Sequence, residues 1–197
     1  MLSLTYFKPY GSSGKRKRSA ITGVGIVLLE KYNGEMCVTL FHDKHRKNYE
    51  EGGGSLDPGE SEAEGAVREL KEESCNLFRL NQESLSPIYY DHRDIYRAYL
   101  VHIKGPNNQI FSSRYYDNLT ILRRNGAPHD WLDTDQLGRF KVSQLVSDEL
   151  LTKRDALVTK LANGTPATIA ARTKACIRQL YKLTNGFSNV AVVEMQS

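Results

Sequence analysis

The sequence predicts an α/β fold: a three-layer α/β/α sandwich around a mixed sheet, with added C-terminal helices. Three observations carry this prediction. An apolar, β-branched run, a tight turn and a second apolar run indicate a hairpin near the N-terminus. One strongly amphipathic helical segment lies between predicted strands. Two further helical patterns follow near the C-terminus, which favours helices packed on both faces of the sheet.

The predicted hairpin begins with a strand over residues 19–30. This run is too short and too rich in β-branched side chains to favour a helix. Asn33-Gly34 is a strong two-residue turn signal, and residues 36–41 form the returning strand. A polar, basic loop follows and leads into three consecutive glycines at residues 52–54.

The clearest helix covers residues 61–74. Ser61 can cap its N-terminus, and Glu64, three residues later, completes a capping box. Alanine, valine and leucine then recur at helical spacing and give the helix an apolar stripe for packing on the sheet: Ala63, Ala66, Val67 and Leu70.

Two more strands are expected over residues 85–90 and 96–103. Residues 105–128 are rich in turn-forming residues at both ends. Their length is unusual for a simple connection, so we expect an insertion that shapes the substrate site.

The C-terminal third is expected to be mainly helical. Residues 137–145 are predicted to hold a last short strand and the start of a helix. Two helices then follow, over residues 147–161 and 166–183, and Asn163-Gly164-Thr165 separates them.

Length and composition fit one globular domain. The chain has 197 residues, a net charge of +4 and 25% charged residues. We assign the domain to residues 19–186, between a flexible basic segment (1–18) and a tail (187–197). No stretch reaches the roughly 18 consecutive apolar residues that a membrane span requires, so no membrane association is expected.

The cysteines favour a reducing compartment. Cys37, Cys75 and Cys176 are widely spaced and odd in number, which speaks against a disulfide framework. The N-terminus lacks the layout of a secretory signal. We therefore expect an intracellular, cytoplasmic protein. The basic run 15–18 leaves a nuclear location open.

Three carboxylates gather on one face of the helix over residues 61–74. Glu69, Glu72 and Glu73 are related by i, i+3 and i+4 spacing, so their like charges repel one another. Clustered hard oxygen ligands suit Mg²⁺ or Mn²⁺ and not zinc. The preceding glycines let backbone approach closely, so a main-chain carbonyl can join the same ion. The alternative is a solvated acidic face with salt bridges to nearby lysines.

This segment resembles the motif of the Nudix hydrolases, G-x5-E-x7-R-E-U-x-E-E-x-G-U, where U is a bulky aliphatic residue. The matching positions span Gly54 to Glu73 and are Gly54, Glu60, Arg68, Glu69, Leu70, Glu72 and Glu73. Two positions depart: Cys75 stands at the second glycine and Asn76 at the last aliphatic residue. These departures put the end of the helix in doubt, and Leu77 is expected to supply the apolar contact one residue late.

The resemblance implies specific roles. Glu69, Glu72 and Glu73 would be catalytic residues that bind Mg²⁺ or Mn²⁺ together with the Gly53 carbonyl. Gly54, Glu60 and Arg68 would be structural, with Arg68 joining loop and helix through a salt bridge. The implied reaction is attack of an activated water on phosphorus in a diphosphate linkage.

Family members often add a carboxylate from further along the chain. Asp135 is the first candidate here, before Asp133 and Asp130, because this acidic stretch precedes the last predicted strand. Asp91 and Asp94 are a second source, and a surface turn is the alternative explanation.

Several cationic and aromatic residues are candidates for substrate binding. Tyr115 or Tyr116 could stack on a nucleobase, and Trp131 could line the pocket. Clustered positive charge suits a polyanionic ligand. The full set of candidates is Lys15, Arg16, Lys17, Arg18, Tyr115, Tyr116, Arg123 and Trp131. The histidines show no metal-ligand spacing.

The resemblance indicates the reaction more closely than the substrate. The first hypothesis is hydrolysis of a nucleoside diphosphate linked to another group, with a phosphorylated small molecule as partner. An mRNA decapping enzyme that binds capped RNA and a diphosphoinositol polyphosphate phosphohydrolase are alternatives. A ligand-binding module without catalysis is a further alternative. Relatives often dimerise, so a homodimer remains open.

Overall fold

The computed structural model describes residues 20–85, 87–104, 108–146 and 157–194. Within them ten strands form one mixed sheet: β1 (Gly23–Tyr32), β2 (Glu35–Asp43), β3 (Asn48–Glu50), β4 (Gly52–Ser55), β5 (Tyr89–His92), β6 (Tyr96–Lys104), β7 (Thr134–Lys141), β8 (Leu157–Lys160), β9 (Pro166–Ile169) and β10 (Val192–Glu194). The helices of these residues are α1 (Glu62–Glu73), α2 (Asn108–Arg124), α3 (Val142–Leu145) and α5 (Ala171–Leu183), with short 3₁₀ turns η1 (Gln82–Ser84) and η2 (His129–Leu132).

The sheet is built around β1. This strand pairs antiparallel with β2 and β4 and parallel with β6, so the predicted mixed sheet is confirmed. The β1–β2 hairpin turns at Asn33 and Gly34, whose φ angles are 50° and 81°. Two positive φ angles are typical of the tight turns that match strand twist, so the local sequence determines this hairpin.

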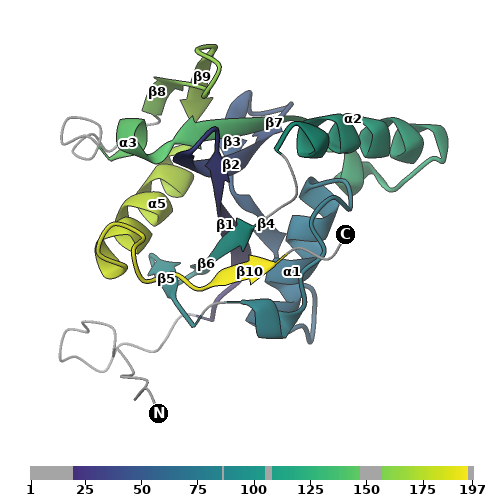
Figure 1. Cartoon of the computed structure of the whole chain (residues 1–197). Helices are drawn as coiled ribbons and strands as arrows, with labels where there is room; N and C mark the ends of the chain where they lie inside the picture. The colour runs from purple at the N-terminus through teal and green to yellow at the C-terminus, as the bar shows by residue number, and fades with distance from the viewer. Residues whose placement is uncertain (1–19, 86, 105–107, 147–156, 195–197) are drawn as a thin grey trace.

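Helices cover both faces of the sheet, as the predicted α/β/α sandwich requires (Figure 1). On one face Val24, Ile26 and Leu28 pack with α1 and α2. On the other face Val27 and Leu29 pack with α3 and α5. Alternate side chains of β1 therefore enter two separate cores, which explains why this strand is apolar throughout.

The start of α1 is as predicted. The Ser61 hydroxyl accepts a hydrogen bond from the Glu64 amide at 3.3 Å, and the Glu64 carboxylate accepts one from the Ser61 amide at 2.9 Å. This reciprocal capping box satisfies two amides that a helix N-terminus otherwise leaves unpaired.

The end of α1 forms although the usual glycine is missing. Cys75 and Asn76 adopt φ angles of 53° and 61°, and the Asn76 amide donates to the Lys71 carbonyl at 2.7 Å. This is the geometry in which a glycine commonly ends a helix, and a side chain there costs about 1 to 2 kcal/mol. Cys75 is fully buried, and Leu77 packs into the same core, as predicted.

The prediction of an insertion over residues 105–128 was wrong, because most of this segment is α2. Tyr115 and Leu119 are buried, and Leu122 packs beside them. Their i, i+4, i+7 spacing gives the helix one apolar stripe. The turn-forming residues at both ends of the segment were given more weight in the sequence-based prediction than this apolar spacing.

Two of the predicted C-terminal helices are also corrected. Residues 157–160 and 166–169 form the antiparallel hairpin β8–β9, which turns at Gly164 with a φ of 90°. The helix α5 therefore starts at Ala171 instead of residue 166. Residues 147–156 lie outside the described residues.

Two further boundaries differ from the prediction. The strand expected over residues 85–90 is β5, which begins only at Tyr89. The segment expected as a tail after residue 186 places Phe187 and Val190 in the core and adds β10 parallel to β6. No helix among the described residues is long and apolar enough to cross a membrane.

Candidate active site

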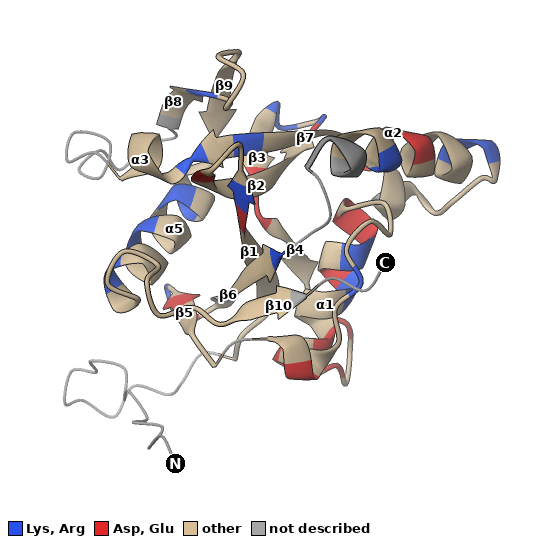
Figure 2. Cartoon of the chain, in the orientation of Figure 1, with Lys and Arg blue, Asp and Glu red and all other residues tan. Residues whose placement is uncertain are grey.

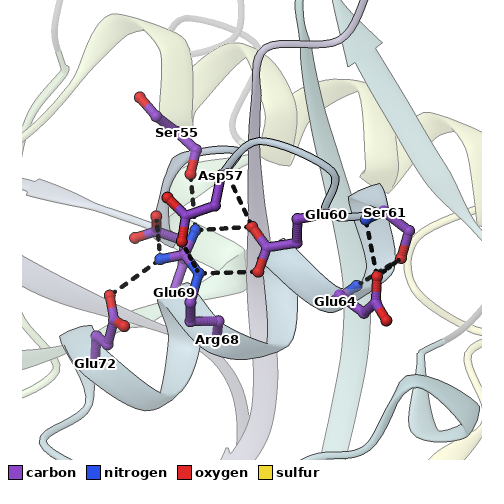
Figure 3. Close-up of polar contacts among 8 residues, drawn as sticks. All are labelled: Ser55, Asp57, Glu60, Ser61, Glu64, Arg68, Glu69 and Glu72. Atoms are coloured by element: carbon purple, nitrogen blue, oxygen red, sulfur yellow. Dashed lines mark hydrogen bonds and ion pairs between the residues drawn. The ribbon is translucent and has the colours of Figure 1, made fainter.

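Arg68 joins the loop before α1 to the helix itself (Figure 3). Its Nε and Nη2 donate to the two Glu60 carboxylate oxygens at 2.9 and 3.0 Å, and Nη2 also donates to the Ser55 carbonyl at 2.8 Å. The guanidinium holds the pKa of Glu60 below its usual value. This fork-to-fork contact fixes the loop on the helix, which is the structural role expected for both residues.

The same guanidinium orients two of the three predicted catalytic carboxylates. Arg68 Nη1 donates to Glu69 at 2.9 Å and to Glu72 at 3.2 Å (Figure 3). Both carboxylates are largely buried, with side chains 13% and 16% exposed. Glu69 and Glu72 are therefore held in defined positions before any ligand arrives.

The glycines of β4 allow Glu69 to lie against the strand. A methyl group at Gly54 would come within 2.5 Å of the Glu69 carboxylate, and one at Gly52 would meet Leu70. On the opposite face, a methyl group at Gly53 would lie 2.4 Å from the Tyr96 hydroxyl. At Gly53 a methyl group would also meet main-chain atoms, the Val24 carbonyl oxygen at 2.4 Å and the Gly25 Cα at 2.6 Å, so a side chain is excluded there. The glycines thus bring main chain next to the acidic helix.

Glu73 differs from Glu69 and Glu72 in its surroundings, which are buried and mainly negative. Burial raises the pKa of Glu73 to about 9. Neighbouring negative charges add to this rise, and they are Glu69, Glu50, Asp43 and Asp133. Among the described residues no cationic side chain lies in ion-pair contact with Glu73. Burial likewise raises the pKa of Glu69 to about 7, although Arg68 partly opposes the rise.

These carboxylates fit divalent cations. At neutral pH the buried Glu73 carboxylate, which has no cationic partner among the described residues, must hold a proton or gain a cation, because a buried negative charge without a partner is costly. Oxygen ligands of this density suit Mg²⁺ or Mn²⁺. The arrangement can therefore bind hard cations beside a flexible glycine backbone.

The candidate additional carboxylates lie in different surroundings. Asp135 is bonded to His42 Nδ1 at 2.6 Å, whereas the charge of Asp133 reaches Glu73. Asp91 pairs with Arg97 through two contacts of 2.7 and 2.9 Å, and Arg97 also lies 3.8 Å from Glu62 at the start of α1. Asp94 is exposed in a turn, and the side chain of Asp130 is not among those described.

Sequence reasoning missed two further acidic residues, Asp43 and Glu50. Both add to the negative charge around Glu73. Glu50 is held by Arg172 at 2.8 Å and by Arg46 at 3.1 Å. The position of Glu50 just before the glycines was the available signal, because β4 continues directly into the site.

The candidate substrate-binding residues are dispersed. Tyr115 is fully buried, and its hydroxyl donates to Thr134 at 3.1 Å, so its ring is not presented to a nucleobase. Tyr116 and Arg123 are exposed on α2, while Trp131 lies against Lys71 with 5.6 Å between the ammonium and the ring centre. The basic residues Lys15 to Arg18 fall outside the described part of the chain.

A separate open cavity of about 360 Å³ lies at the β8–β9 hairpin. His42, Tyr49 and Gln136 line it together with residues of that hairpin. Its lining does not include the acidic residues of α1, so the carboxylate cluster and this cavity are distinct features of the surface.

Comparison with known proteins shows the fold. No family model matches this chain, and no curated protein matches it. A MutT/nudix family protein from Enterococcus faecalis aligns with a TM-score of 0.51 and 16% identity, over 88% of this chain and 65% of that chain. An Ap4A hydrolase from C. elegans aligns with a TM-score of 0.33 and 21% identity, over 43% of this chain and 68% of that chain.

The Enterococcus structure supports a conclusion about architecture alone, because its identity to this chain is low. The motif residues independently occupy the positions described above: Gly54 on β4, Arg68 at the loop contact, and the glutamates along α1. This chain therefore has the fold of the MutT/Nudix proteins, with the Nudix motif at its acidic helix.

Proposed function

We propose that this protein is a Mg²⁺- or Mn²⁺-dependent pyrophosphohydrolase that cleaves a diphosphate linkage in a nucleoside diphosphate-linked substrate. The observation that carries the proposal is the buried pair Glu69 and Glu73, which lies beside a glycine strand without enough positive charge to neutralise it. The fold and the motif support the same reaction class.

Glu69, Glu72 and Glu73 would hold the cations, together with the Gly53 carbonyl. When bound, the cations would neutralise phosphate oxygens and lower the pKa of the attacking water. Arg68 orients Glu69 and Glu72 in advance, so little rearrangement is needed when a ligand binds. Before the cations bind, Glu69 can hold a proton near neutral pH because its pKa is about 7.

Replacing single carboxylates tests this proposal. Glu69→Gln and Glu72→Gln should each lower cation-dependent turnover by about 10²-fold or more, because each loses a charged ligand but keeps its shape. Glu62→Gln is the matched control, since Glu62 lies on the same helix and is 41% exposed. Release of phosphate or nucleotide would be measured with Mg²⁺ and with Mn²⁺. Unchanged turnover in both site variants would contradict the assignment.

A decapping activity on capped RNA is the second candidate. Exposed arginines at the end of α2, Arg123 and Arg124, favour a polyanionic ligand (Figure 2). Other basic residues give less support, because Arg172 is engaged by Glu50 and Lys174 is buried. A substrate panel should include capped RNA, dinucleotides, ADP-ribose, nucleoside triphosphates and diphosphoinositol phosphates. Binding without turnover of any of them would favour the non-catalytic module.

A further inference from the structure

A second group of metal-ligating side chains lies beside the acidic helix. His45 follows β2, whereas His129 is the first residue of the 3₁₀ turn η2 and Asp133 follows that turn. One oxygen of Asp133, Oδ1, lies 3.4 Å from His45 Nε2 and 3.3 Å from His129 Nδ1. The imidazole rings are stacked at 6.1 Å with planes 24° apart, so both present a nitrogen to the same carboxylate oxygen.

The Asp133 oxygen is an independent sign that something is missing. Oδ1 is buried at the atomic level and accepts no hydrogen bond from the described residues. Lys44 Nζ lies 3.7 Å from it but donates its hydrogen bond to the Leu132 carbonyl. Although the Asp133 side chain is 38% exposed as a whole, its Oδ1 is enclosed and receives no hydrogen bond from the Lys44 ammonium at that distance. A carboxylate oxygen in this position is stabilised when a cation binds it directly.

The spacing of these atoms matches a tetrahedral metal site. Zinc bonds to imidazole nitrogen and carboxylate oxygen are about 2.0–2.2 Å long, so neighbouring ligand atoms lie about 3.3–3.5 Å apart. The two measured separations, 3.4 and 3.3 Å, fall at this value. The two imidazole nitrogens also lie within 4.8 Å of one another.

We propose that His45, His129 and Asp133 form a binding site for a transition-metal ion such as Zn²⁺ or Co²⁺. Imidazole nitrogens select these borderline ions over Mg²⁺, which prefers oxygen ligands alone. The site is therefore chemically distinct from the carboxylate site on α1. It does not depend on hydrolase activity, because the ligands, the distances and the unsatisfied oxygen are all features of this trio.

Trp131 gives a direct probe, because it is the only tryptophan of the chain and lies between His129 and Asp133 in η2. Co²⁺ quenches indole fluorescence at close range, whereas Mg²⁺ does not. The protein would be titrated with Co²⁺ in excess Mg²⁺, which keeps the α1 carboxylates occupied. We expect saturable quenching that Zn²⁺ competes away.

Ligand variants decide between metal binding and a simple ion pair. His45→Ala and His129→Ala should each raise the apparent Kd for Co²⁺ by about tenfold or more. Both side chains are exposed, at 59% and 76%, so folding should tolerate either change, and thermal unfolding would verify this. Lys44→Ala is the matched control. It contacts the same Asp133 from the same loop but cannot ligate as an ammonium, so Co²⁺ affinity should stay equal or increase.

Two results would overturn the site. One is a Co²⁺ affinity in the His45→Ala/His129→Ala double variant that equals that of the unmodified protein. The other is loss of quenching as Mg²⁺ is raised over the range that fills the α1 carboxylates, since this would place Co²⁺ at those glutamates. If turnover is absent but Co²⁺ binding follows the histidines, the hydrolase proposal fails and the metal site stands.

Discussion

At the scale of single residues, the carboxylates of the acidic helix and its neighbours repel one another. Glu73 is buried among other carboxylates, and its pKa rises to about 9 as a result. Without cations the folded protein relieves this repulsion by holding protons that the unfolded chain would release. Its stability should therefore depend on pH in a way that one substitution can isolate.

Glu73→Gln should stabilise the metal-free protein at alkaline pH. The folded state holds the Glu73 proton more tightly than the unfolded chain, where the pKa is near 4.5. This contribution is complete below pH 4.5 and is lost as pH rises towards 9, with a slope of at most about 1.4 kcal/mol per pH unit. The glutamine variant lacks this loss and should be more stable by about 1 to 3 kcal/mol at pH 8.5.

Urea unfolding in chelator at pH 4.5 and pH 8.5 measures this difference. Glu83→Gln serves as control, because Glu83 is exposed on η1 and is not among the charges that raise the pKa of Glu73. A variant whose advantage over the unmodified protein does not grow with pH would contradict the buried, proton-holding state of Glu73.

At the scale of elements, α2 supports the helix that carries the site. Tyr115 donates to Thr134, and Thr134 donates in turn to the Glu73 carbonyl at 2.8 Å. The stripe of Tyr115 and Leu119 fills the core on the α1 side of the sheet. Packing thus makes a helix from residues whose composition indicated turns, since most helical stability in proteins comes from the buried face.

Leu119→Ala should destabilise the protein by about 2 to 5 kcal/mol, because Leu119 is 3% exposed and alanine leaves a cavity in the core. Ile121→Ala in the same helix should change stability by less than about 0.5 kcal/mol, because Ile121 is 53% exposed. Urea midpoints of the two variants give the comparison. Similar losses for both would show that α2 is not anchored by this stripe.

At the scale of the whole molecule, one arginine ties the C-terminal helix to the site strands. Arg172 of α5 donates to Glu51 at 3.0 Å and to Glu50 at 2.8 Å, across more than half of the chain. Glu51 is also bonded by Thr173, and its side chain has no exposure to solvent. Helix α5 therefore fixes the position of Glu50 and Glu51, which connect β3 to the glycine strand β4.

Arg172→Met should destabilise the protein by about 3 to 5 kcal/mol, because it leaves the buried Glu51 carboxylate with only a hydroxyl partner. Lys182→Met on the exposed face of α5 is the control. Adding Glu51→Gln to Arg172→Met should restore part of the loss, measured by a double-mutant cycle. Strictly additive losses would show that the two residues do not act as a pair.

Local sequence signals predicted the parts of the fold that local physics controls. The Asn33-Gly34 turn, the Ser61–Glu64 capping box and the buried strand β1 are confirmed. Segments whose structure depends on distant partners were misjudged. The strand β9 pairs with β3, and α2 packs on a core that includes side chains of the distant strand β1.

The sequence alone determined the acidic helix, because helical spacing places Glu69, Glu72 and Glu73 on one face whatever surrounds them. The resemblance to the Nudix motif implied a salt bridge from Arg68 that joins loop and helix, and the structure shows Glu60 as its partner. Only the tertiary structure decided how deeply Glu73 is buried, which acidic residues surround it, and that His45 meets His129 and Asp133. These properties depend on chain segments that are distant in sequence and come together only in the folded protein, so no local sequence pattern predicts them.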